Sequence, residues 1–177
     1  MIASLVKGTV LGGLVLFIWG AISWMALPWH GASLLTFGNE DAVTQAIVAN
    51  APRSGMYLLP NAGAEQKSAH EKMAKGPVVL ASVRTGPIGS MTVFMISGLV
   101  IQMLGALLGT ALLLQTRPLS YGGRVLFLLG IALSAGVLAH LPDWNWWSFS
   151  ASYTMLAFAD LIIGWLLAGL VIAKVAK

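Results

Sequence analysis

Four long apolar stretches, separated by polar segments, dominate the hydrophobic pattern of the chain. They cover residues 8–27, 88–114, 125–141 and 149–173. A hydrocarbon core of about 30 Å is crossed by a helix of about 17 to 25 residues, and each stretch is long enough. The pattern therefore predicts an all-α membrane protein with four transmembrane helices, the first within residues 1–28 and the other three within residues 88–177.

The segment between the first two spans, residues 29–87, is much more polar. It contains five of the ten basic residues and four of the six acidic ones. The expected elements are a helix after the start signal Asn39-Glu40-Asp41, a polar helix over 62–75, and two strands over 56–59 and 78–83. We therefore predict a small α/β extramembrane lobe, which leans on the membrane helices or on a partner because it has few large apolar residues.

The composition agrees with a membrane protein and narrows its partners. Hydrophobic residues make up 58% of the chain and charged residues only 9%, whereas soluble domains have about 25% charged residues. The basic residues are scattered, so we expect the lipid bilayer as a partner and no nucleic acid. Cysteine is absent, which excludes disulfides and thiolate metal sites. We expect no cofactor.

The basic residues of the termini and short loops predict the orientation. With four spans, one side of the membrane receives Lys7, Arg117, Arg124, Lys174 and Lys177. The positive-inside rule places this side, with both termini, in the cytoplasm of a bacterial inner membrane, and residues 29–87 in the periplasm or outside. An aromatic belt is expected at the outer interface, formed by Trp24, Trp29, Trp144, Trp146 and Trp147.

Asp160 is an acidic residue near the middle of the fourth span. An ionisable group at that depth is costly, so it faces protein or a cavity and is a functional candidate. Ala157, Gly164 and Ala168 lie three, four and eight residues away, so they share its helical face. Small residues on one face favour close contact with another helix.

The second span has a similar face, and its depth suggests a partner for Asp160. The face consists of Gly98, Gln102, Gly105 and Gly109, and includes a GxxxG motif. At about 1.5 Å per residue, Gln102 and Asp160 both fall near the middle of the membrane. We therefore predict that the second and fourth spans pack together and that Gln102 forms a hydrogen bond with Asp160. Asp160 is then either a polar contact between helices or part of a proton or ion pathway.

A third interpretation is catalytic and comes with a resemblance. The stretch concerned is Ala157-Phe158-Ala159-Asp160-Leu161-Ile162-Ile163-Gly164. It resembles the last catalytic helix of lipoprotein signal peptidases, which also have four spans, both termini inside and an outer lobe after the first span. The resemblance implies an aspartyl peptidase in which Asp143 and Asp160 share a proton and activate water.

The chain departs from the pattern of that family at two places. Ala157 and Phe158 stand where the family has an Asn before the helix Asp, and Gln115-Thr116-Arg117 does not supply its Asn-x-x-Asp-Arg signature.

Two histidines permit a metal hypothesis. His30 and His140 are both expected at the outer interface, near Asp143. Imidazole and carboxylate together suit zinc or copper, although this sequence spacing is not diagnostic of a metal site.

The leading functional hypothesis is not enzymatic. Small-residue faces on several helices and an aromatic outer rim favour an accessory, assembly or scaffold subunit, in a larger membrane complex or in a homo-oligomer. The alternatives are a small proton- or ion-coupled transporter or channel using Asp160, and a membrane-embedded aspartyl hydrolase using Asp143 and Asp160.

Overall fold

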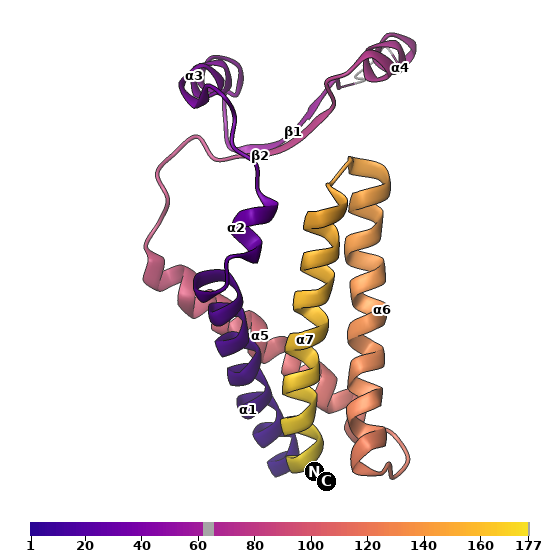
Figure 1. The fold of residues 1–177 in the computed structure, drawn as a ribbon. Helices are drawn as coiled ribbons and strands as arrows, with labels where there is room; N and C mark the ends of the chain where they lie inside the picture. Colours follow the sequence, from indigo (N-terminus) through magenta and orange to yellow (C-terminus); the bar gives the residue numbers. More distant parts are fainter. Residues whose placement is uncertain (62–65, 177) are drawn as a thin grey trace.

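The computed structural model describes residues 1–61 and 66–176, and the chain is mostly helical (Figure 1). Within these residues four helices are long and apolar enough to cross a membrane. They are α1 (Ile2–Ala21) with the π-helical turn η1 (Ile22–Ala26), α5 (Met91–Leu114), α6 (Tyr121–Trp147) and α7 (Ala151–Val175). The prediction of four long apolar helices is confirmed, and the ends of each helix differ from the predicted ones by a few residues.

The largest difference concerns the end of the third span. The third span was predicted to end at residue 141, and proline, which follows at position 142, usually ends a helix at the preceding residue. Instead α6 continues through Pro142 to Trp147. It ends at Ser148, whose left-handed conformation (φ 60°) turns the chain toward α7. α6 packs against α7, and such tertiary packing overrides the local preference of the sequence.

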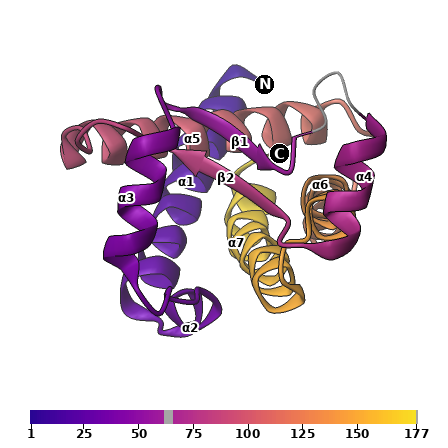
Figure 2. The same cartoon turned by 90° about the horizontal axis from the view of Figure 1, so that it is seen from above.

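The four helices form a row rather than a closed bundle. α1 packs against both α5 and α7, and α7 packs against both α1 and α6. α5 runs obliquely across the other helices, whereas α6 and α7 lie side by side as an antiparallel helical hairpin (Figures 1 and 2). Buried apolar side chains at the centre of the row include Leu16, Ala106, Leu128 and Ile172.

Glycines let α1 approach both of its neighbours closely. A Cβ atom at Gly12 would lie 2.6 Å from Cδ1 of Ile172 on α7, and one at Gly13 would lie 2.8 Å from the Cα of Met103 on α5. A Cβ atom at Gly8 would likewise lie too close to the side chain of Thr110 on α5. Gly20, by contrast, has no neighbour within 4 Å. Close approach through glycine is therefore found at Gly8, Gly12 and Gly13 and not at Gly20.

The remaining elements form a lobe at the end of the helices opposite the two termini (Figure 1). They are α2 (Trp29–Ser33), α3 (Glu40–Asn50), β1 (Gly55–Leu59), α4 (Gln66–Lys75) and β2 (Val79–Val83). β1 and β2 pair antiparallel, with Tyr57 opposite Ala81. Asn39 begins α3 as expected, because its side-chain oxygen accepts a hydrogen bond from the N–H of Ala42 at 2.9 Å. The first residues of the helix predicted over 62–75 lie outside the described residues.

Candidate functional site

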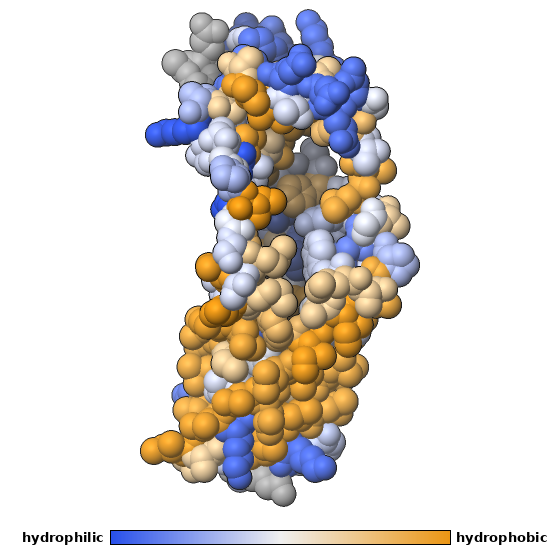
Figure 3. All heavy atoms as spheres, turned by 90° about the vertical axis from the view of Figure 1, so that its left-hand side faces the viewer, coloured by the Kyte–Doolittle hydropathy of each residue, from blue (hydrophilic) through white to orange (hydrophobic). Residues whose placement is uncertain are grey.

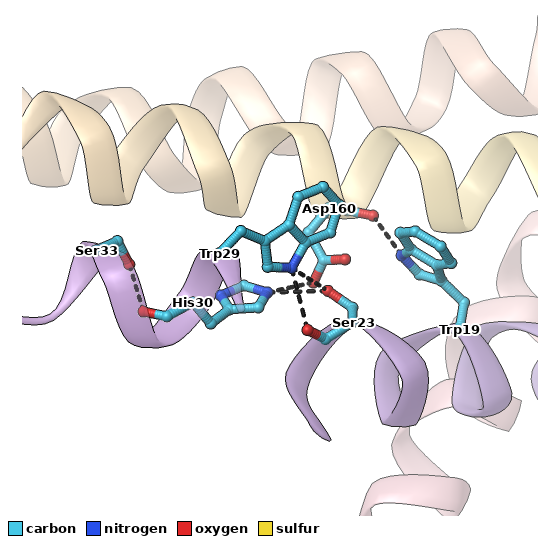
Figure 4. Close-up of polar contacts among 6 residues, drawn as sticks. All are labelled: Trp19, Ser23, Trp29, His30, Ser33 and Asp160. Atoms are coloured by element: carbon cyan, nitrogen blue, oxygen red, sulfur yellow. Dashed lines mark hydrogen bonds and ion pairs between the residues drawn. The ribbon is translucent and has the colours of Figure 1, made fainter. Parts of the chain in front are cut away.

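Asp160 lies in the first half of α7 and faces the connection between α1 and the lobe. Its Oδ2 atom is 3.5 Å from Nε2 of His30 on α2, and the two side chains are only 16% and 5% exposed. Oγ of Ser23, in η1, lies 2.9 Å from the same His30 nitrogen. Figure 4 shows the three side chains converging from two segments that are distant in sequence. We call Ser23, His30 and Asp160 the polar cluster.

The local sequence brings Ser23 and His30 together although they are seven residues apart. Pro28 cannot continue a helix, so the chain turns after η1 and begins the short helix α2. Nε1 of Trp29 then donates hydrogen bonds back to the carbonyl and the hydroxyl oxygen of Ser23, at 3.0 and 3.1 Å. Ser33 donates to the carbonyl of His30 at 2.8 Å. These bonds fold residues 23–33 into a compact hook that presents His30 to α7.

Tryptophans enclose the polar cluster. The ring of Trp24 stacks on His30 with a centroid separation of 3.8 Å and an interplanar angle of 8°. Trp29 contacts His30 edge-on at 5.9 Å. Nε1 of Trp19 donates to the backbone carbonyl of Asp160 at 3.1 Å. The aromatic rings shield the cluster on the side of α1 and α2, so its hydrogen bonds lie in surroundings of low polarity.

A cavity of about 350 Å³ opens beside Asp160. Its polar lining comes from His30, Gln102, His140, Tyr153 and Asp160, and Trp19, Trp24 and Trp165 belong to its walls. Oδ1 of Asp160 is enclosed and has no hydrogen-bond partner among the described residues. On the α1 and α5 side, the surface of the molecule is hollowed between the lobe and the apolar helices (Figure 3).

The predicted bond between Gln102 and Asp160 is not present. Gln102 lines the same cavity, but the carboxylate oxygens of Asp160 have His30, and not Gln102, as their neighbour. The reason is the order of the helices, because α1 lies between α5 and α7. The ring of Trp165 on α7 packs against α5, where a Cβ atom at Gly109 would lie only 2.8 Å from it and one at Gly105 would lie 3.7 Å from it.

The other glycines of the predicted packing faces have different neighbours. A Cβ atom at Gly98 would lie 3.8 Å from the ring of Phe17, and one at Gly164 would lie 2.9 Å from the ring of Trp19. Both neighbours belong to α1. The small-residue face of α5 is thus shared between α1, at Gly98, and Trp165 of α7, whereas Gly164 of α7 faces α1.

The polar cluster does not have the geometry of a catalytic triad. In a triad the serine and the aspartate bind opposite nitrogens of the histidine ring. Here Ser23 and Asp160 both lie against Nε2. Ser23 is also fully buried, so a substrate carbonyl has no access to its hydroxyl group. Ser23, His30 and Asp160 are therefore not arranged as a Ser-His-Asp triad.

Asp143 and Asp160 do not line a common cavity. Asp143 lies near the end of α6 and lines a smaller cavity, whereas Asp160 lines the larger one, and the two cavities share His140, Tyr153 and Ala157 in their linings. Among the described residues, no group of three His, Asp or Glu side chains is placed to hold a metal ion. The set of His30, His140 and Asp143 is therefore not assembled as a metal site.

The five tryptophans of the predicted belt lie at the lobe end of the helices. Trp144, Trp146 and Trp147 are exposed on the last turns of α6, and Trp24 is exposed beside α2. Trp29 is the exception, because its ring is used inside the hook.

Sequence reasoning missed Ser23 and Trp19 as members of the site. Ser23 could have been noticed as a polar residue inside the first apolar stretch. No sequence pattern indicated that Trp19 would reach the carbonyl of Asp160, 141 residues away.

The chain matches no protein-family model, no curated protein and no solved structure. The functional interpretation therefore depends on the geometry of the chain itself.

Proposed function

We propose that this protein is an integral membrane accessory or scaffold subunit, which joins a larger membrane complex or a homo-oligomer through its lobe. In this proposal the four long helices span a bacterial inner membrane, both termini are cytoplasmic and the lobe is periplasmic. The support for this orientation is the distribution of charge: Lys7, Arg117, Arg124 and Lys174 belong to the end of the molecule that carries the termini.

The surface of the lobe is the observation that carries the proposal. None of the residues of α3 is buried. Val48 is 74% exposed, Met56 is 65% exposed, and Leu59 is also exposed. Neither α3 nor α4 packs extensively on the four long helices. Exposed apolar side chains of this kind favour a protein partner that covers them.

The sheet of the lobe gives the same indication. β1 and β2 pair only with each other among the described residues, so each strand keeps one edge with unpaired backbone groups. An isolated two-stranded sheet is marginally stable in water. A partner that adds a strand or covers an edge would satisfy these groups and stabilise the sheet.

The polar cluster fits this function as an anchor. His30 and Ser23 belong to the hook at the base of the lobe, and Asp160 belongs to α7. The cluster therefore fixes the base of the lobe to the membrane helices. A fixed base would hold the docking surface in a constant position relative to the bilayer, which lowers the entropy lost on binding.

The test is purification from native membranes in mild detergent, with identification and stoichiometry of the chains that co-purify. Val48→Lys should lower the yield of the complex at least about fivefold, because burying a charge in an apolar contact costs more than about 1 kcal/mol. Ala46→Lys is the matched control, since residue 46 is exposed on the opposite side of the same helix. It should leave the complex intact, and both variants should keep the circular dichroism spectrum of the wild type.

The composition of the complex separates the two forms of the proposal. A second protein at fixed stoichiometry identifies an accessory subunit, and a complex containing only this chain identifies a homo-oligomer. A monomer that co-purifies with no other protein, or equal losses for the two variants, would contradict the proposal.

One observation favours proton- or ion-coupled transport as a second candidate function. Asp160 is an acidic residue inside an apolar helix, it lines an open cavity, and its Oδ1 has no partner among the described residues. Buried carboxyl groups with these features occur in proton and ion pathways. The test at Asp160 is described with the residue-scale prediction below.

A further inference from the structure

A second cavity lies at the end of the molecule that carries the termini, far from the polar cluster. It has a volume of about 420 Å³ and lies between the end of α5, the start of α6 and the end of α7. Its polar lining is Thr116, Arg117 and Arg124, and its apolar lining includes Leu113, Leu114 and Leu119.

The start of α6 and the end of α7 are joined firmly at this cavity. Nη1 of Arg124 donates a hydrogen bond to the carbonyl of Ala176 at 2.9 Å, and the hydroxyl of Tyr121 donates to the carbonyl of Leu170 at 3.0 Å. The guanidinium group of Arg124 is thus held in place. Its Nε atom is enclosed and has no hydrogen-bond partner among the described residues.

Among the described residues, no acidic side chain pairs with the positive charge at this cavity. Neither Arg117 nor Arg124 forms an ion pair with a side chain of the described residues. The ion pair found among these residues joins His30 and Asp160. The sequence explains this, because no Asp or Glu occurs between residues 72 and 142 or after residue 160. An anion is the chemical group that would complement two arginines here, and the guanidinium group binds phosphate oxygens with bidentate geometry.

We propose that this cavity binds the phosphate of an anionic glycerophospholipid, with its acyl chains along the apolar wall. Basic pockets between transmembrane helices, at the height of the head groups, are suited to such lipids. Leu113 and Leu114 belong to the end of α5, on the membrane side of Arg117 along the chain, and Leu119 lies in the loop before α6, so a single cavity offers both a charged and an apolar surface. A free phosphate ion shares the chemistry of the head group but gains nothing from the leucines.

The experiment is native mass spectrometry of the full-length protein in detergent, titrated with dioctanoyl phosphatidylglycerol, dioctanoyl phosphatidylcholine or inorganic phosphate. The wild type should bind phosphatidylglycerol at least about fivefold more tightly than phosphatidylcholine, since each basic residue near the membrane surface contributes about 1 kcal/mol. Arg117→Gln should reduce the affinity for phosphatidylglycerol about fivefold. Arg117 is exposed, so this variant is expected to fold. Arg124→Lys keeps the charge and should reduce the affinity less than Arg124→Gln.

Lys7→Gln and Lys174→Gln are the matched controls, because they remove charges at the same end of the molecule but outside the cavity lining. They should change the affinity less than twofold, because both side chains are exposed and their charges are screened by salt. Equal affinity for the two lipids, or equal losses in the Lys and Arg variants, would overturn the site. Inorganic phosphate binding as tightly as phosphatidylglycerol would overturn the lipid as its ligand.

Discussion

At the scale of single residues, the polar cluster determines what Asp160 can do. Its carboxylate lies against Nε2 of His30, which Ser23 also contacts. If Nε2 carries the hydrogen, it faces an acceptor in the carboxylate of Asp160, and the Ser23 hydroxyl can then accept from the same N–H. The carboxylate is then an acceptor, and an amide oxygen at the same position can replace it.

This geometry predicts that two substitutions of Asp160 change the stability of the protein to different extents. Asp160→Asn keeps an acceptor for His30 and should unfold in mixed micelles within about 0.5 kcal/mol of the wild type, whereas Asp160→Leu should lose about 1 kcal/mol. His30→Leu should show a similar loss, and the double variant Asp160→Leu/His30→Leu should be little worse than either single variant, because the two residues form one interaction.

Gln102→Leu provides the control for that pair, since Gln102 lines the cavity without bonding Asp160. Its effect should add to that of Asp160→Leu within about 0.5 kcal/mol. In proteoliposomes, a proton flux that the wild type has and the well-folded Asp160→Asn lacks would favour transport over anchoring. Strong coupling of Gln102 to Asp160 would contradict the geometry described above.

At the scale of the elements, α1 organises the four long helices because it contacts two of the others, α5 and α7, through its glycines. We expect Gly13→Ala to destabilise the protein by about 1 to 3 kcal/mol, because the new Cβ would lie 2.8 Å from the backbone of Met103 and would force α1 and α5 apart. Gly20→Ala, in the same helix, should be neutral or stabilising by up to about 1 kcal/mol, since it meets no atom within 4 Å.

Equilibrium unfolding in mixed micelles, followed by circular dichroism, measures both variants. Equal destabilisation by Gly13→Ala and Gly20→Ala would show that helix propensity, and not close packing of α1 on α5, governs the effect.

At the scale of the whole molecule, the proposed orientation predicts where reporters become active. Two fusion reporters distinguish the sides of the membrane. Alkaline phosphatase is active only in the periplasm, and green fluorescent protein fluoresces only in the cytoplasm. A fusion after Lys177 should therefore fluoresce, and an insertion of alkaline phosphatase near Gly63 should be enzymatically active, because the basic residues near the termini stay on the cytoplasmic side. The reverse pattern would exclude the periplasmic lobe.

The sequence by itself determined the elements whose formation is a local matter. A helix that crosses lipid must satisfy its own backbone hydrogen bonds, so length and hydropathy alone located four long helices. Asn39 marked the start of α3, and the two short apolar runs of the lobe paired as strands. Counting residues along the spans also placed Gln102 and Asp160 at a similar level, and both line one cavity.

The tertiary structure alone decided which faces meet. Depth along a helix follows from counting residues, but the neighbour of a side chain depends on the order and rotation of the helices. α1 lies between α5 and α7, so Asp160 meets His30 and not Gln102. The path of the chain through Pro142 was likewise set by the contact of α6 with α7. Hydropathy carries no information about these contacts, because in a membrane the apolar residues that face lipid and those that face another helix are alike.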